Sequence, residues 1–95
     1  RFMSQMVRCF ACAVGRVQGV GFRMFVRQQA VMHDITGWVK NMPDGTVTME
    51  LQGASSAVEA AFTAIRKGNY FIHVEQLSVE PRDMISGERD FSIRY

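Results

Sequence analysis

Residues 14–23 read Val14-Gly15-Arg16-Val17-Gln18-Gly19-Val20-Gly21-Phe22-Arg23, so that three glycines fall within seven positions. The apolar run that precedes them, 7–14, predicts a strand, and a helical pattern begins at Phe22. Glycines let a loop adopt positive φ, which allows several backbone N–H groups to point at one position. Because the start of a helix adds unpaired N–H groups, the segment predicts a site for an oxyanion, with phosphate as the first candidate.

Arg23 falls in the first turn of the predicted helix, where its guanidinium can donate two hydrogen bonds to the same anion. A second interpretation gives the glycines a backbone role alone, in a tight turn from strand to helix. The segment by itself does not decide between an anion site and such a turn.

The length and charge of the chain restrict the class of protein. Its 95 residues suit one domain over 1–95, with the residues before about Met6 interpreted as disordered or as an addition to the natural chain. No apolar run approaches the ~20 residues of a membrane span, and the first residues do not resemble a signal peptide. The net charge of +2, from scattered basic residues, argues against nucleic acid and is compatible with a small anionic substrate.

Cys9 and Cys12 have the C-x-x-C spacing of redox and zinc sites. In a strand, however, an offset of three places the two side chains on opposite faces. His33 and His73 are isolated in the sequence and do not complete a ligand set. We therefore expect two free thiols, no metal and a location in the reducing cytoplasm.

Periodicity and turn residues predict the remaining elements. The predicted buried stripes of the two helices are Phe22, Phe25, Val26, Gln29, Ala30 and His33 in the first and Val58, Ala61, Phe62 and Ile65 in the second. Helix 22–33 ends at Asp34, which occupies a position that favours the left-handed conformation. Ser55 or Ser56 caps the second helix, with Ser56 and Glu59 at capping-box spacing, and Lys67 and Gly68 end it. The predicted strands are 7–14, 35–41, 46–51, 72–80 and 91–95. The third is expected to end before Gly53, and the fourth to contain a bulge near Glu75 and Gln76.

This order, β-α-β-β-α-β plus a terminal strand, predicts an α+β fold in which both helices cover one face of a single sheet. The expected order of the first four strands is 4-1-3-2, with the last strand outside the second. The first two strands then run parallel, and their carboxyl ends meet at one edge of the sheet. This topology places Asn41, at the end of the second strand, near the anion site.

The sequence resembles the acylphosphatase family. Residues 15–23 resemble the first family signature without a mismatch, and residues 37–41 with 44–47 and Gly53 resemble the second. Residues 91–95 are similar to the usual C-terminal strand, so that the resemblance covers about 7–95. The sequence departs from the family pattern at Asp34, where glycine is common, and at residues 69–71, where a Gly-Pro stretch is often found.

The resemblance implies a ferredoxin-like α/β sandwich that hydrolyses acyl phosphates without metal or cofactor. It implies that Asn41 holds the attacking water. It also implies that the phosphoryl group is bound by Arg23 and by the backbone of Gly15, Arg16, Val17, Gln18, Gly19, Val20, Gly21 and Phe22. The expected ligands are an acyl phosphate and inorganic phosphate, and the expected state is a monomer that binds neither nucleic acid nor membrane.

Two alternatives stay open at this stage. The chain could be a binding module of the same fold that holds phosphate or an acyl phosphate without turnover. The α-carboxylate of Tyr95 could reach Arg23, or Tyr95 could merely end the edge strand. Trp38 is interpreted as a packing residue of the sheet, not as a substrate contact.

Overall fold

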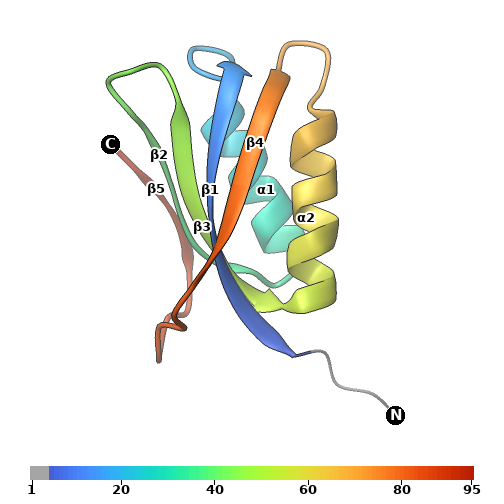
Figure 1. Cartoon of the computed structure of the whole chain (residues 1–95), viewed down its shortest axis with the longest axis vertical. Helices are drawn as coiled ribbons and strands as arrows, with labels where there is room; N and C mark the ends of the chain where they lie inside the picture. Colours follow the sequence, from blue (N-terminus) through green and yellow to red (C-terminus); the bar gives the residue numbers. More distant parts are fainter. Residues whose placement is uncertain (1–4) are drawn as a thin grey trace.

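The computed structural model describes residues 5–95, so the predicted tail before about Met6 lies, apart from Gln5, outside the described residues. The described residues form a five-stranded sheet with two helices packed on one of its faces (Figure 1). The elements in chain order are β1 (Met6–Arg16), α1 (Phe22–Met32), β2 (Thr36–Asn41), β3 (Val47–Ala54), α2 (Ser55–Lys67), β4 (His73–Arg82) and β5 (Phe91–Arg94). This order confirms the predicted α+β class.

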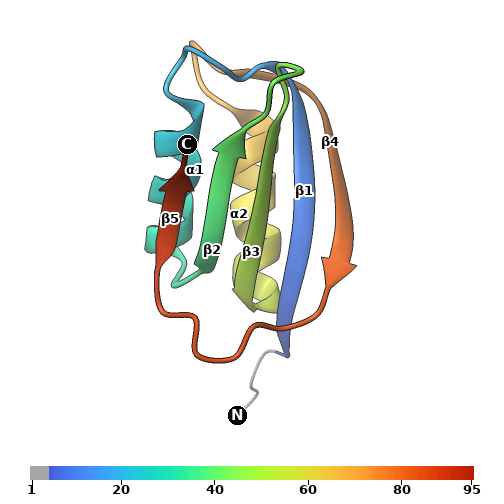
Figure 2. The ribbon, with the colours of Figure 1, turned by 90° about the vertical axis from the view of Figure 1, so that its left-hand side faces the viewer.

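The strands lie in the order β4-β1-β3-β2-β5, which confirms the predicted topology (Figure 2). β1 pairs antiparallel with β3 and β4, β2 pairs antiparallel with β3, and β5 pairs parallel with β2. The loop after β1 and the carboxyl ends of β2 and β5 consequently lie at the same end of the sheet (Figure 2). This end carries the residues that the sequence assigned to an anion site.

The core lies between the sheet and the helices and follows the predicted periodicities. The helix positions that are fully buried are Phe22, Val26 and Ala30 in α1 and Val58, Ala61, Phe62 and Ile65 in α2. All of them belong to the predicted apolar stripes. Within residues 5–95, no helix is long and apolar enough to span a membrane.

The two cysteines are free thiols on opposite faces of β1, as predicted. Cys9 packs against the core on the helix side, where burial raises the pKa of its thiol. Cys12 pairs with Thr48 of β3 and Ser78 of β4 on the open face. Because the sheet separates the thiols, they cannot form the C-x-x-C pair that their spacing suggests.

The pairing of β1 with β4 contains the predicted bulge, and it corrects the predicted start of the glycine loop. Val14 pairs with Gln76 while Gly15 pairs with Val74, which leaves Glu75 as the extra residue of β4. A Cβ on Gly15 would lie 2.2 Å from the carbonyl oxygen of His73, so only glycine permits this close approach. Gly15 and Arg16 therefore belong to β1, and the prediction that the loop begins at Gly15 is wrong.

A second correction concerns the passage from β3 to α2. Gly53 was expected to end the strand, but it pairs with Val7 and is buried within β3. The N-cap of α2 is Ala54, so Ser55 and Ser56 lie inside the helix and the predicted capping box is wrong. Pairing with the first residues of β1 extends the strand past its glycine, an effect that local sequence does not signal. The other boundaries differ from the prediction by one or two residues.

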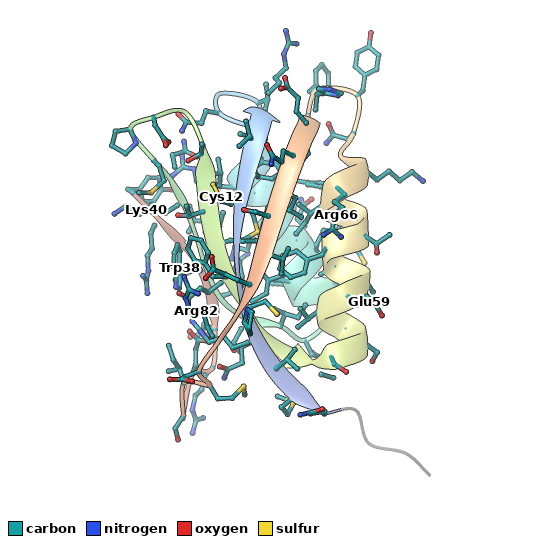
Figure 3. The ribbon with its side chains drawn as sticks, viewed as in Figure 1. Cys12, Trp38, Lys40, Glu59, Arg66 and Arg82 are labelled. Carbon is teal, nitrogen blue, oxygen red and sulfur yellow. The ribbon has the colours of Figure 1, made fainter. Side chains whose placement is uncertain are left out.

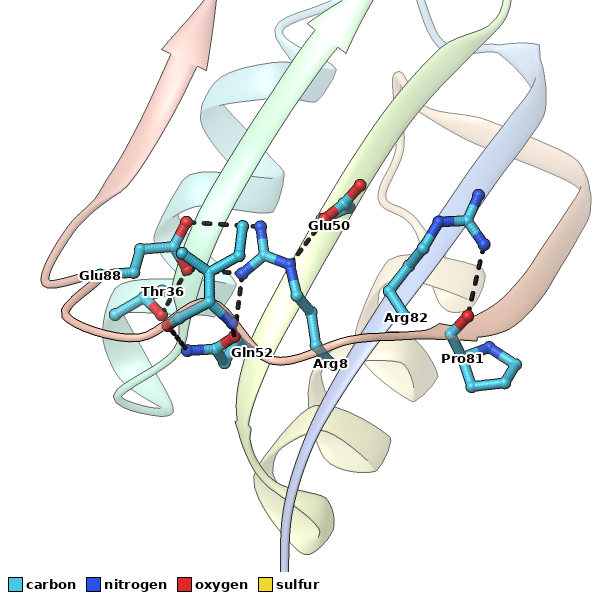
Figure 4. A network of polar contacts seen from close by, with 8 residues as sticks. Arg8, Thr36, Glu50, Gln52, Pro81, Arg82 and Glu88 are labelled. Atoms are coloured by element: carbon cyan, nitrogen blue, oxygen red, sulfur yellow. Dashed lines mark hydrogen bonds and ion pairs between the residues drawn. The ribbon is translucent and has the colours of Figure 1, made fainter.

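Arg8 is the one charged residue that the described chain buries, with 2% of its surface exposed. Its guanidinium donates to Glu50 at 2.6 Å and to both carboxylate oxygens of Glu88, at 2.7 and 3.3 Å (Figure 4). Glu88 also accepts from Thr36, and Gln52 joins Arg8 to the backbone of Ile85. This network fastens the segment between β4 and β5 over part of the open face.

Candidate active site

A cavity of about 200 Å³ opens at the end of the sheet where the loop after β1 and the carboxyl ends of β2 and β5 lie. Its lining residues are Val17, Gly19, Gly21, Phe22, Arg23, Met24, Asn41, Ile93 and Tyr95. Arg23 comes from the first turn of α1 and Asn41 is the last residue of β2. The fold thus brings together two residues that are 18 positions apart in the sequence.

Val17, Gly19 and Gly21 of the loop 17–21 line this cavity. Gly19 and Gly21 have φ of 75° and 78°, in the left-handed region that a glycine adopts without strain. Among the described residues, the N–H groups of 17–24 donate to no backbone or side-chain acceptor. Gly21 is the N-cap of α1, so part of this set is the unpaired first turn of a helix, which carries partial positive charge. Such a cluster of N–H groups favours an anion.

The side chain of Gln18 holds the loop against the turn between β2 and β3. Its Nε2 donates to the carbonyl oxygens of Met42 at 2.8 Å and Thr46 at 2.9 Å. Within that turn, the hydroxyl and N–H of Thr46 donate to Asp44, which lowers the pKa of the Asp44 carboxyl below its ordinary value. The turn that follows Asn41 and the glycine loop are therefore joined in one polar unit.

Arg23 is half-buried and is oriented by the last residues of the chain. Its Nη1 donates to the carbonyl oxygen of Arg94 at 3.1 Å, and its Cζ lies 4.7 Å from the ring centroid of Tyr95. Among the ion pairs of the described residues, none joins Arg23 to the terminal carboxylate. Tyr95 thus touches Arg23 through its ring, and most guanidinium donors stay available to a ligand.

Asn41 carries an unsatisfied polar atom. Its Oδ1 is buried and has no hydrogen-bond partner, and it is the one such side-chain atom among the described residues. A buried acceptor without a donor costs about 1–3 kcal/mol, so polar side chains are rarely left in this state. Asn41 also lines the cavity, so its carboxamide is the uncharged polar side chain that lies beside any ligand or water bound there.

Not every residue of the predicted loop lines the cavity. Gly15 and Arg16 pair with β4, Gln18 faces the β2–β3 turn, and Val20 packs against the core. Met24 and Ile93 line the cavity without having been predicted, because an exposed methionine and a strand isoleucine carry no sequence signal of their own.

Trp38 lies outside the cavity, on the open face of the sheet, in agreement with its interpretation as a packing residue. Its ring lies 6.5 Å from that of Phe10, and the Arg94 guanidinium lies 4.8 Å above it. Figure 3 shows Trp38 and Lys40 on the side of the molecule opposite Glu59 and Arg66 of α2.

A larger groove of about 530 Å³ runs beside α2, between this helix and β4. Its walls are side chains such as Val58 and Phe62, with Glu59 and Arg66 exposed at its margin. Its lining includes Ser55 and Ser56 at the start of α2, but the N–H of Ser55 already donates to the carbonyl oxygen of Gln5, and no glycine of the described residues lines the groove. The smaller cavity beside Arg23 is therefore the better candidate for chemistry.

Comparison with known proteins gives consistent matches. The family model described as Acylphosphatase matches residues 9–93. A Geobacillus kaustophilus protein named Acylphosphatase is 48% identical over 90 residues, which cover 95% of this chain and 96% of that protein. The crystal structure of acylphosphatase from Bacillus subtilis is 36% identical, with a TM-score of 0.88 over 96% of this chain and 100% of that chain. Full-length HypF, in a form described as phosphate- and nucleotide-bound, is 26% identical with a TM-score of 0.85, over 99% of this chain and 12% of its own.

Proposed function

This chain belongs to the acylphosphatase family, and from that premise we propose that its cavity hydrolyses the mixed anhydride of acyl phosphates. The reaction is R–CO–O–PO₃²⁻ + H₂O → R–COO⁻ + H₂PO₄⁻, with cleavage of the bond between phosphorus and the bridging oxygen. The observation that carries the proposal is that Arg23, the glycine loop and Asn41, whose Oδ1 has no hydrogen-bond partner, line one cavity.

The phosphoryl group binds to the backbone N–H groups of the 17–21 loop and the start of α1, and to the Arg23 guanidinium. Arg23 carries the one charged side chain among the residues that line the cavity, so it adds a positive charge beside the backbone donors. Charge in the transition state spreads over the three equatorial oxygens of phosphorus. Donors that are already in place before the substrate binds stabilise this charge without reorganisation.

Asn41 positions the water. Its Oδ1 accepts a hydrogen bond from a water molecule, which orients a lone pair of the water towards phosphorus and fulfils the missing contact of the carboxamide. This is a positioning role, since an amide oxygen is too weak a base to remove the proton. The proton goes to a phosphate oxygen, and the carboxylate departs as a good leaving group.

A second candidate function is binding without turnover. It is favoured by the likeness to one part of HypF, which covers only 12% of that chain and whose structure is described as phosphate-bound. Release of inorganic phosphate from acetyl phosphate, measured with EDTA present, separates the two. Turnover well above the uncatalysed rate supports hydrolysis, and saturable phosphate binding with no turnover supports the binding module.

A further inference from the structure

Apolar side chains stand exposed at the mouth of the proposed active site. Met24 and Tyr95 line the cavity, yet Met24 is 52% exposed and Tyr95 is 92% exposed. Ile93, which is half-buried against the core, lines the same cavity. Single exposed apolar residues are ordinary on protein surfaces. Two exposed apolar side chains and a half-buried one around the cavity that holds Arg23, from α1 and from the end of β5, form a distinct apolar margin.

Strand alternation and helix geometry explain why these side chains meet there. Phe91, Ile93 and Tyr95 follow one another on the same face of β5 and its continuation, and exposure rises from 5% at Phe91 to 92% at Tyr95. Met24 follows Arg23 in the first turn of α1, whose core positions are Phe22 and Val26. The apolar face of β5 thus continues beyond the core to the cavity mouth, where Met24 adds a contribution from α1.

The size of the cavity determines what can lie on this margin. About 200 Å³ is less than the roughly 300–1,000 Å³ of pockets that enclose a whole small molecule. If the loop and Arg23 hold the phosphoryl group, and a water on Asn41 attacks in line, the acyl group leaves on the side opposite Asn41. The hydrocarbon part of the acyl group then has to lie outside the cavity, at its margin.

We propose that Met24, Ile93 and Tyr95 form an acyl platform, a surface that binds the hydrocarbon part of the substrate and makes the enzyme favour longer apolar acyl phosphates. This inference rests on the proposed function. The thioether of Met24 adapts to chains of different shape. A fully buried methylene group strengthens binding roughly fourfold, and on a half-open margin the gain per methylene is smaller.

The test compares acetyl, butyryl and hexanoyl phosphate. Their carboxylate leaving groups are nearly equal in acidity, so differences in kcat/KM report contacts of the chain and not the chemical step. We expect kcat/KM to rise about fivefold from acetyl to hexanoyl phosphate, chiefly through KM. Met24→Ser is expected to reduce this ratio to within about twofold of unity.

Met32→Ser is the matched control, because Met32 lies in the same helix, is 70% exposed and does not line the cavity. It should keep the fivefold ratio. Equal kcat/KM along the series in the unaltered protein, or an equal effect of the two methionine variants, would overturn the acyl platform. Failure of the unaltered protein to hydrolyse any of the three substrates would instead overturn the proposed function.

Discussion

The guanidinium of Arg23 lies over the ring of Tyr95, with 4.7 Å between Cζ and the ring centroid. The same guanidinium donates to the carbonyl oxygen of Arg94, so the end of β5 holds Arg23 by one polar and one aromatic contact. An arginine in a solvent-accessible first helical turn has many rotamers, and both contacts reduce that freedom. The orientation of the one charged side chain that lines the cavity therefore depends on residues more than 70 positions away.

Loss of the Tyr95 ring should weaken catalysis moderately. A cation–π contact at an exposed site contributes about 0.5–1 kcal/mol, which corresponds to a two- to fivefold change. We expect Tyr95→Ala to lower kcat/KM for acetyl phosphate by about this factor. Tyr95→Phe keeps the ring, so its kcat/KM should equal that of the unaltered protein. A short Gly-Ser extension after Tyr95 moves the carboxylate but keeps the ring, so it should have little effect. A large loss of activity with the extension would assign the role to the carboxylate.

Replacement of Arg23 should remove most of the activity. We expect Arg23→Ala to lower kcat/KM at least about a hundredfold, because a charge-assisted donor to the transition state is lost, and to weaken inhibition by inorganic phosphate. Arg27→Ala is the matched control: Arg27 lies one turn further along α1 and also donates to a β5 carbonyl, that of Phe91, but does not line the cavity. Comparable losses in both variants would contradict a specific role for Arg23.

Asn41→Ala should separate turnover from affinity and from stability. We expect kcat to fall strongly while the inhibition constant of inorganic phosphate changes little, since Asn41 acts on water. The free energy of unfolding should stay unchanged or rise by up to about 1 kcal/mol, because the buried Oδ1 has no partner to lose. Urea denaturation checks the second expectation. A clear loss of stability would show that Asn41 has a structural role.

The network around Arg8 predicts loss of stability in acid. Burial alone would raise the pKa of the Glu88 carboxyl, but hydrogen bonds from Arg8 and Thr36, with the positive charges of Arg8 and Arg94, outweigh it and lower the pKa below the ordinary 4.5. A depressed folded-state pKa contributes stability that is complete above 4.5 and is lost as pH falls through the lower folded-state value. The free energy of unfolding should therefore decrease below about pH 4.5.

Glu88→Gln tests this assignment. Because it removes one of the two charged partners of a fully buried guanidinium, we expect it to cost about 2 kcal/mol at pH 7, a difference that shrinks as pH falls below 4.5. Glu80→Gln is the control, since Glu80 pairs with Arg82 on the surface, where an ion pair contributes about 0–1 kcal/mol. Similar pH profiles for both variants would assign the acid sensitivity to other groups.

Much of the fold could be predicted because it rests on local patterns and on rules of chain connection. The four predicted apolar positions of α2 are its four buried residues. The break in the alternation of apolar and polar residues near Glu75 correctly predicted the bulge. Asp34 adopts a φ of 56°, as its place after a helix indicated. The parallel relation of the first two strands was enough to place Asn41 beside the glycine loop.

The remaining features depend on distant contacts. A single arginine in an apolar strand gives no sign that residues 83–90 will bury it, because Glu88 meets Arg8 only in the folded sheet. Ala54 became a helix cap because the start of β1 pairs with the end of β3, against the local preference for serine. The unpartnered oxygen of Asn41 is likewise a property of the packed site and of no sequence pattern.

The strand order has a consequence for how fast the protein folds. β1 lies between β3 and β4, and its pairing with β4 joins residues 8–16 to residues 73–82. β2 pairs with β5, which lies near the C-terminal end of the chain. The chain loses the entropy of closing these large loops before the strand contacts form, which raises the folding barrier. Refolding is therefore expected in milliseconds to seconds, not microseconds. The cavity needs the ends of β1, β2 and β5 at once, and therefore enzymatic activity should recover only with this slow step, after the helices have formed.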